Sequence, residues 1–264
     1  MSILRRVVPA AVLATALLLA GCGAASNDSV NPGSHEPAAT GDPGITGEVT
    51  VFAAASLRAA FDDIAAAFEQ RNPNADVRPI VYDGSSTLVT QLQEGARADV
   101  LATADERNMQ SIVDAGLAAA PQLFATNTLV VAVPAGNPAG VHELADLADA
   151  VTVLCAPEVP CGSATVRLLD AAGVSVNAAS LEQNVTAVLQ KVAAGEADAG
   201  LVYATDVIGD DAVENFTPAG AEDVVNRYPI VALDGAGDAG AAFVEFVLGD
   251  EGRRILGEYG FGAP

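Results

Sequence analysis

Apolar residues along this chain alternate between short continuous runs and longer stretches at helical spacing. The first run follows Gly47, where residues 49–52 are β-branched or aromatic, which is typical of a buried strand. The next stretch, to about residue 70, has one apolar face and predicts a helix that packs on a sheet. The apolar positions of this helix are Leu57, Phe61, Ile64 and Phe68.

The same alternation continues through the first half of the chain. Strands are predicted at 76–82 and 99–102, and helices at 88–95 and 106–115. Strands that alternate with helices favour a parallel sheet covered by helices. In such sheets, ligands bind beyond the carboxyl ends of the strands.

A second set of elements follows, between two extended runs at residues 128–133 and 228–233. Its predicted elements are the strands 151–154 and 199–203 and the helices 144–148, 164–171 and 185–194. Two more helices are predicted near the end of the sequence, at 239–248 and 252–259. Two αβ sets joined by two extended runs predict two lobes with a ligand cleft between them.

The first 47 residues show no such pattern. Arg5 and Arg6 precede an apolar run that is short for a membrane span, which is typical of an export signal. The run ends in Leu-Ala-Gly-Cys at Cys22, which resembles the lipobox of bacterial lipoproteins and implies that Cys22 is lipidated. We therefore expect a lipoprotein signal peptide at 1–22, a flexible Gly/Ser/Pro-rich linker at 23–47, and export to the outer face of the cell membrane.

The charge balance argues against one broad class of function. The chain has 264 residues, with 12 Lys and Arg against 34 Asp and Glu, and a formal net charge of −22. A nucleic-acid binder needs a basic face, and the sequence shows none, so we expect no nucleic-acid partner. The same acidity repels anions at long range, so local backbone dipoles would have to hold any anionic ligand.

Serines stand where predicted strands meet predicted helices. Ser56 follows the strand at 49–52, and Ser85 and Ser86 follow the strand at 76–82. A Ser in this position commonly caps the helix, because its oxygen accepts a hydrogen bond from an orphan backbone N–H. The same position also presents several N–H groups and the helix dipole to an anion. Recurrence of the arrangement favours an anion site, with plain caps as the alternative.

Other chemical motifs are weaker. Residues 235–240 match a dinucleotide-binding fingerprint, but the sequence has no room after them for the strand that the fingerprint requires, so we interpret them as a turn. His142 is the one histidine in the predicted folded region that could activate a serine nucleophile. Asp105, Glu106 and Asp206 lack the clustered spacing of a metal site, so none is predicted.

Two cysteines, Cys155 and Cys161, remain once Cys22 is assigned to lipidation. Export would place them in an oxidising compartment, where a disulfide can form. Such a short loop gains roughly 2 kcal/mol from closure on the entropy model. Two buried free thiols are the alternative.

An ordered set of short motifs resembles one known family. In sequence order the motifs are Val-Phe-Ala-Ala-Ala-Ser-Leu at 51–57, Ser-Ser-Thr-Leu at 85–88, Ala-Asp-Val-Leu-Ala-Thr-Ala-Asp at 98–105, Leu-Val-Tyr-Ala-Thr-Asp at 201–206, Tyr-Pro-Ile-Val at 228–231 and Tyr-Gly-Phe at 259–261. Together they resemble the periplasmic molybdate-binding proteins of molybdate ABC transporters, over residues 48–264. Each motif alone is weak, and the ordered set is specific.

The resemblance implies a two-lobed periplasmic-binding fold of type II, an α/β fold in which each lobe is a mostly parallel sheet flanked by helices. We assign the first lobe to 48–127, the second lobe to 128–229 and a return segment of the first lobe to 230–264. The implied ligand is molybdate or tungstate, bound as an oxyanion without a cofactor. The implied partner is an ABC permease, and the protein is expected to be a monomer without enzymatic activity.

Residues that match the family's uncharged ligand donors can be named one by one. Ser56, Ser85 and Tyr203 match its hydroxyl donors, and Cys161 and Val185 match positions that donate a backbone N–H. The family has Ala where this chain has Cys161, a change that a backbone contact tolerates. Neutral donors at helix starts agree with the serine pattern, since they bind a dianion and leave no buried charge in the empty site.

Two rival functions stay open from the sequence. The first is a binding protein for sulfate or another tetrahedral oxyanion, which would use the same donors. The second is a surface hydrolase that uses His142.

Overall fold

The computed structural model describes residues 44–264. The predicted signal peptide, Cys22 and most of the predicted linker lie outside these residues. Among the described residues, no helix combines the length and apolar character needed to span a membrane.

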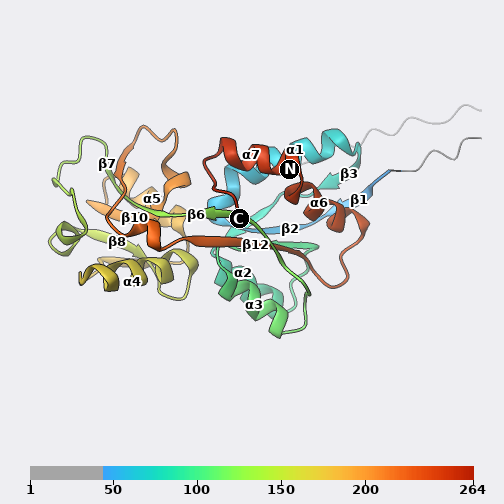
Figure 1. The fold of residues 1–264 in the computed structure, drawn as a ribbon, viewed down its shortest axis with the longest axis horizontal. Coiled ribbons are helices and arrows are strands. Elements are labelled where there is room, and N and C mark those ends of the chain that lie inside the picture. The colour runs from blue at the N-terminus through green and yellow to red at the C-terminus, as the bar shows by residue number, and fades with distance from the viewer. Residues whose placement is uncertain (1–43) are drawn as a thin grey trace, which may run out of the picture. The chain divides into compact units, whose positions relative to one another are not determined.

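The first sheet brings together segments from both ends of the described chain (Figure 1). Its strands in spatial order are β4 (Val81–Asp83), β2 (Val51–Ala54), β5 (Val100–Ala102), β12 (Asn226–Ala232) and β6 (Gln122–Asn127). β2 is parallel to β4 and β5, whereas β12 is antiparallel to β5 and β6. A separate parallel pair, β1 (Thr46–Val49) with β3 (Asn74–Val77), lies beside this sheet.

Helices cover both faces of the first sheet, and we call the sheet and its helices the first lobe. One face carries α1 (Arg58–Arg71), α6 (Asp238–Leu248) and α7 (Asp250–Glu258), and the other carries α2 (Ser85–Gln93) and α3 (Glu106–Asp114) (Figure 1). Each face has its own buried cluster, because alternate residues of a strand point to opposite sides. The cluster under α1 contains Phe61, Phe68 and Phe243, and the ring of Phe243 meets each of the other two edge to face.

The second lobe repeats this plan with one continuous core. Its strands in spatial order are β11 (Val213–Phe216), β7 (Leu129–Pro134), β10 (Ala199–Tyr203), β8 (Thr152–Cys155) and β9 (Ser180–Glu182). β8 is parallel to β9 and β10, and β7 is antiparallel to β10 and β11. The helices α4 (Pro160–Ala172) and α5 (Val185–Ala193) pack against this sheet. Short 3₁₀ turns complete the chain: η1 (Ala55–Leu57), η2 (Leu144–Ala148), η3 (Ala204–Val207) and η4 (Ala221–Asp223).

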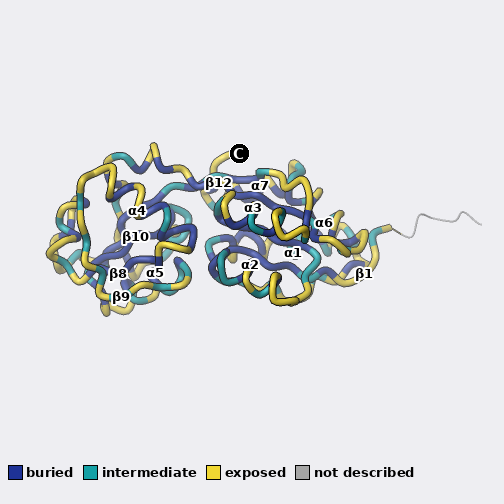
Figure 2. The backbone as a smooth tube through the Cα atoms, turned by 90° about the horizontal axis from the view of Figure 1, so that it is seen from below, coloured by how far each residue is buried: buried dark blue, intermediate teal, exposed yellow. Residues whose placement is uncertain are grey.

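The chain crosses between the lobes at two adjacent places. It leaves the first sheet at the end of β6 and enters the second at β7, with only Thr128 between them. It returns through β12, which pairs with β6 from Asn226 onward and lies at the join of the two lobes (Figure 2). The predicted boundary between residues 229 and 230 therefore falls inside β12.

The predicted fold class is confirmed, with two differences in detail. In each of the two five-stranded sheets, three parallel strands occupy one side and antiparallel pairing adds the other two strands, a larger antiparallel share than the prediction of mostly parallel sheets. The antiparallel strands are those that cross between the lobes or pair with a crossing strand. The single strand predicted at 76–82 is two strands, β3 and β4, because Pro79 between them has no N–H for a sheet ladder.

Candidate functional site

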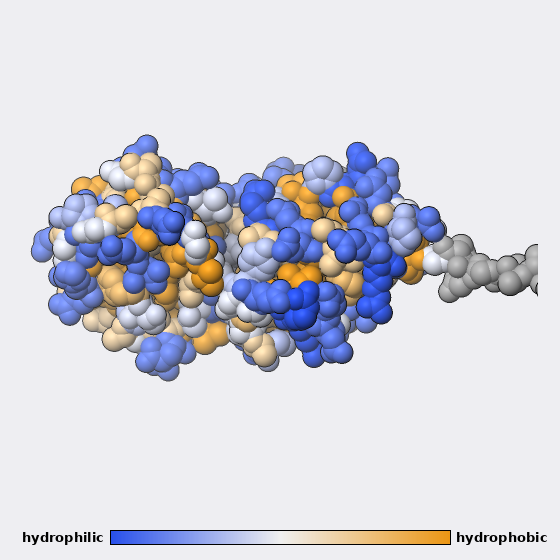
Figure 3. Space-filling view, turned by 90° about the horizontal axis from the view of Figure 1, so that it is seen from above, coloured by the Kyte–Doolittle hydropathy of each residue, from blue (hydrophilic) through white to orange (hydrophobic). Residues whose placement is uncertain are grey.

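A small cavity lies between the two lobes, where the space-filling view shows a furrow (Figure 3). Its void is about 220 Å³, of which about 20 Å³ can be reached by the centre of a water-sized sphere. Pockets for organic ligands span roughly 300–1,000 Å³, so this cavity is sized for a small ion. Its lining residues are Ala54, Ala55, Ser56, Asp83, Gly84, Ser85, Ala104, Val159, Pro160, Cys161, Asn184, Val185 and Tyr203.

Every residue that the sequence predicted for the site lies in this lining: Ser56, Ser85, Cys161, Val185 and Tyr203. The topology explains why they meet. In the first lobe the neighbouring parallel strands β2 and β4 end beside each other and lead into η1 and α2. In the second lobe the neighbouring strands β8 and β9 lead likewise into α4 and α5, and Tyr203 ends β10. Helix starts from both lobes thus face one cavity.

The two serines are not the plain helix caps that the sequence left open as the alternative to an anion site. Neither η1, α1 nor α2 has a side-chain cap, and Gly84 rather than Ser85 is the N-cap residue of α2. Instead, the Ser85 Oγ accepts a hydrogen bond from the N–H of Ala104 at 3.0 Å. The hydroxyls of Ser56 and Tyr228 lie 3.0 Å apart and form a hydrogen bond. The first N–H groups of a helix have no partner within it, so the first turn of α2 keeps its donors for the cavity.

Tyr203 reaches the cavity from the second lobe and is held by a residue of β12. The Nδ2 of Asn226 donates one hydrogen bond to the Tyr203 Oη at 2.9 Å and another to the carbonyl oxygen of Ala104 at 2.8 Å. Tyr203 is 1% exposed, and burial raises the pKa of its hydroxyl well above the ordinary value. The hydroxyl therefore stays protonated at neutral pH and keeps its hydrogen.

The second lobe contributes two helix starts to the cavity. Cys161 is in the first turn of α4, which begins at Pro160, and it forms a disulfide with Cys155. Val185 is the first residue of α5, whose N-cap Asn184 accepts a hydrogen bond from the N–H of Ala187 at 3.0 Å. The start of a helix carries a partial positive charge, so both positions favour an anion in the cavity.

Direct contacts between the lobes surround the cavity. The Nδ2 of Asn184 donates to the Asp83 Oδ1 at 2.9 Å, and the Nη2 of Arg107 donates to the carbonyl oxygen of Glu158 at 2.8 Å. At Gly84 the backbone lies so close to the carbonyl oxygen of Gln183 that a Cβ would overlap it. The structure therefore has the two lobes in contact at the cleft.

Comparison with known proteins places the chain in a family. The family model for bacterial extracellular solute-binding proteins matches residues 49–262. The chain is 43% identical over 261 residues to the molybdate-binding protein ModA of Mycobacterium tuberculosis, covering 96% of this chain and 97% of that one. The chain belongs to the bacterial extracellular solute-binding protein family.

Solved structures show the same fold at lower identity. The periplasmic molybdate-binding protein of Azotobacter vinelandii aligns with a TM-score of 0.70 and 19% identity, over 82% of this chain and 99% of that chain. The sulfate-binding protein SubI of Mycobacterium tuberculosis aligns with a TM-score of 0.68 and 17% identity, over 82% of this chain and 86% of that chain. Proteins of this fold therefore include a molybdate-binding and a sulfate-binding protein.

In this solute-binding protein no Lys or Arg lines the cavity among the described residues, and the carboxylate of Asp83 is the only side-chain charge in the lining. Asp83 accepts hydrogen bonds from the N–H of Gly84 at 2.7 Å and from Asn184, which spread its charge over two donors. Any anion in the cavity must therefore be held by N–H and O–H dipoles.

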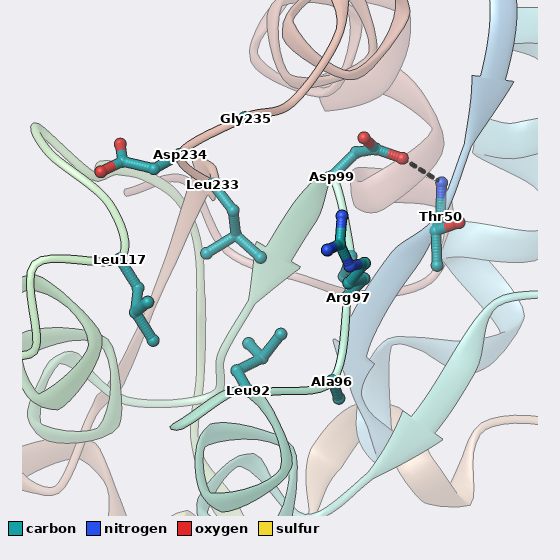
Figure 4. A pocket seen from close by; sticks show the side chains of 10 residues that line it. Thr50, Leu92, Ala96, Arg97, Asp99, Leu117, Leu233, Asp234 and Gly235 are labelled. Atoms are coloured by element: carbon teal, nitrogen blue, oxygen red, sulfur yellow. Dashed lines mark hydrogen bonds between the residues drawn. The ribbon is translucent and has the colours of Figure 1, made fainter. Parts of the chain in front are cut away.

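A larger hollow at the other end of the strands of the first sheet does not suit an anion (Figure 4). Its void is about 760 Å³, against about 220 Å³ for the cavity between the lobes, and it lies at the amino ends of β2 and β5. Arg97 lines it, but so do the carboxylates of Asp99 and Asp234, and no helix of eight or more residues starts there. The Asp99 Oδ2 already accepts a hydrogen bond from the N–H of Thr50 at 2.7 Å.

The residues of the rejected motifs lie outside the cavity. His142 is exposed and lines a separate hollow with Glu214. Residues 235–240 span a turn and the start of α6. Among the described residues, no group of three or more His, Cys, Asp and Glu is placed to hold a metal ion.

Sequence reasoning missed the residues that support the site: Asp83, Gly84, Asn184 and Asn226. A signal existed for Asn184, because Asn before a helix is a strong N-cap. Asp83 and Gly84 stand directly before the serines that were noticed. Asn226 carried no signal, because its contacts with Ala104 and Tyr203 join residues 122 and 23 positions away along the chain.

We expect Gly84→Ala to weaken ligand binding roughly a hundredfold or more, because the added methyl group keeps the lobes apart. Hydrogen bonds from one lobe to a charged ligand are then lost, and each is worth roughly 1.5–3 kcal/mol. Gly84 has φ −59° and ψ 136°, which Ala adopts freely, so the thermal stability of the empty protein should not fall. Calorimetric titration and thermal unfolding measure both.

Gly257→Ala is the control, since a Cβ at that helical position meets no atom within 4 Å. Wild-type affinity in Gly84→Ala would show that the two lobes need not approach at Gly84 when ligand is bound.

Asp206 gives this solute-binding protein a pH-dependent stability. Burial raises the pKa of Asp206 to about 7, opposed by the hydrogen bond that it accepts from the Tyr203 N–H at 2.8 Å. Between about pH 4 and 7 the Asp206 carboxyl keeps its proton in the folded protein but has lost it in the unfolded chain. Its contribution to the free energy of unfolding therefore falls as the pH rises through this range. We expect Asp206→Asn to gain roughly 1–4 kcal/mol of unfolding free energy relative to wild type over that range.

Urea unfolding at pH 4.5 and 8 measures this change, with the exposed Asp211→Asn as control. If Asp206→Asn changes the free energy of unfolding by the same amount at pH 4.5 and pH 8, the pKa of Asp206 is not raised in the folded protein.

Proposed function

We propose that the protein captures molybdate or tungstate in the cavity between its lobes and delivers the oxyanion to an ABC permease. The ligand donors in this proposal are the hydroxyls of Ser56, Ser85 and Tyr203 and the backbone N–H groups of Cys161 and Val185. The mechanism is closure of the two lobes on the anion, which shifts an open–closed equilibrium, and no chemical step is involved.

The lining of the cavity is the observation that best supports an anionic ligand. A dianion without a cationic partner needs several oriented donors, and helix starts together with the hydroxyl side chains beside them supply both N–H and O–H donors. Each hydrogen bond to a charged acceptor contributes roughly 1.5–3 kcal/mol, so several of them can offset desolvation and the repulsion from an acidic protein. The small cavity volume supports an inorganic ion over an organic substrate.

Molybdate is favoured over sulfate by sequence similarity. The 43% identical relative, which covers nearly the whole chain, is named a molybdate-binding protein. The sulfate-binding neighbour shares 17% identity, which supports only the common fold. Because molybdate, tungstate and sulfate are tetrahedral dianions of equal charge, the size of the cavity has to discriminate between them.

The structure argues against the hydrolase alternative. His142 lies in a different hollow from the serines of the cavity, so it cannot activate either of them as a nucleophile.

Calorimetric titration of the full chain, purified in mild detergent and freed of anions, tests this function. We expect one-to-one binding of molybdate, comparable binding of tungstate, and sulfate binding weaker by orders of magnitude. Binding that is tightest for sulfate would reassign the protein to another oxyanion. No binding of any of the three would refute the proposal.

Anchoring at Cys22 is also part of the proposal, and it rests on the lipobox-like sequence that ends there. We expect Cys22→Ser to prevent lipid attachment, which needs the thiol, and to move the protein from the membrane fraction to the soluble fraction. Fractionation of expressing cells measures the change. Ser34→Ala, in the predicted linker, is the control, and membrane retention of Cys22→Ser would contradict the anchor.

A further inference from the structure

The hydrogen-bond partners of the cavity hydroxyls determine which way their hydrogens point. A hydroxyl can donate one hydrogen and also accept, so it serves an anion only when its hydrogen is free to face the ligand. At Ser85 the question is settled by the backbone, because the Ala104 N–H can only donate and the Ser85 Oγ must accept from it. The hydrogen of Ser85 is therefore left for the cavity.

At Tyr203 the same question is settled by a side chain. Asn226 is 2% exposed, and its amide group faces the carbonyl oxygen of Ala104 at 2.8 Å. A carbonyl oxygen only accepts, so the atom of Asn226 that faces it must be Nδ2 and not Oδ1. The second hydrogen of Nδ2 then points to the Tyr203 Oη at 2.9 Å, and Tyr203 must accept it.

The other end of the Asn226 side chain supports this interpretation. Its Oδ1 is buried and has no hydrogen-bond partner among the described protein groups. A buried acceptor without a partner destabilises the fold, so the useful part of this amide is its pair of hydrogens.

We infer that Asn226 is a positioning residue that fixes the Tyr203 hydroxyl as a donor toward the bound oxyanion. This inference rests on the proposed function and adds to it a residue outside the cavity lining. Asn226 lies on β12 of the first lobe and Tyr203 ends β10 of the second. One amide therefore couples a ligand hydroxyl of the second lobe to Ala104, whose N–H orients Ser85 in the first lobe.

A double-mutant cycle with calorimetric molybdate and tungstate titration tests the role. We expect Asn226→Ala to weaken binding roughly ten- to hundredfold when residue 203 is Tyr, because the hydroxyl is no longer oriented. In a Tyr203→Phe background the same substitution should change affinity less than about threefold, since no hydroxyl remains to be oriented. Asn226→Asp should weaken binding more than Asn226→Ala, because an ionised carboxylate accepts the Tyr203 hydrogen and adds a negative charge.

Asn127→Ala is the matched control. Asn127 is also buried, pairs directly with Asn226 in the β6–β12 register, and donates to the Thr205 Oγ1 rather than to Tyr203. It should change affinity equally in the wild-type and Tyr203→Phe backgrounds. Thermal unfolding of each empty variant shows that it is folded.

The outcomes separate the two proposals. Wild-type protein that binds no oxyanion refutes the proposed function and this inference with it. Wild-type protein that binds, with an Asn226→Ala loss of the same size in both backgrounds, leaves the proposed function standing and overturns the inference, because Asn226 would then act only through the structure of the join.

Discussion

The constraint on which this structure depends is that dipoles, rather than cations, must face the cavity. No Lys or Arg lines it among the described residues, and the chain as a whole has a formal charge of −22. A cation can attract an anion from many directions, whereas an N–H or O–H group must be aimed at it. The site therefore lies at the ends of adjacent parallel strands that lead into helices, where the helix starts already present N–H groups in a fixed direction.

Residues at the join between the lobes contact residues of the proposed ligand site. β12 pairs with both β5 and β6 in the first sheet, and it begins at Asn226, which touches Tyr203 of the second lobe. Two residues further on, Tyr228 bonds to Ser56. Because alternate strand residues point to the same side, both side chains lie on the same face of the sheet. A change in the angle between the lobes would thus displace the hydroxyls of Ser56 and Tyr203, which are proposed to bind the ligand.

The alternation of strands and helices was enough to predict the fold class, and the motif set was enough to gather Ser56, Ser85, Cys161, Val185 and Tyr203 in one lining. The roles of the serines were harder to predict. A Ser before a helix suggests a cap from local sequence alone, whereas the Ser85 Oγ accepts a hydrogen bond from the N–H of Ala104, which follows the end of β5. Contacts of this kind depend on register between distant strands, which no local pattern encodes.

The start of α4 in the second lobe shows how a donor can be oriented without a hydroxyl side chain. The disulfide from Cys155 to Cys161 closes the loop before α4, and a Cβ at Gly162 would overlap the carbonyl oxygen of Ala156. The backbone at the start of α4 is therefore held by a covalent bond and by close packing. A donor that is fixed before binding loses little conformational entropy when the ligand arrives. Cysteine at position 161 is thus compatible with the proposed backbone donor there, because the disulfide engages the side chain that differs and not the backbone N–H.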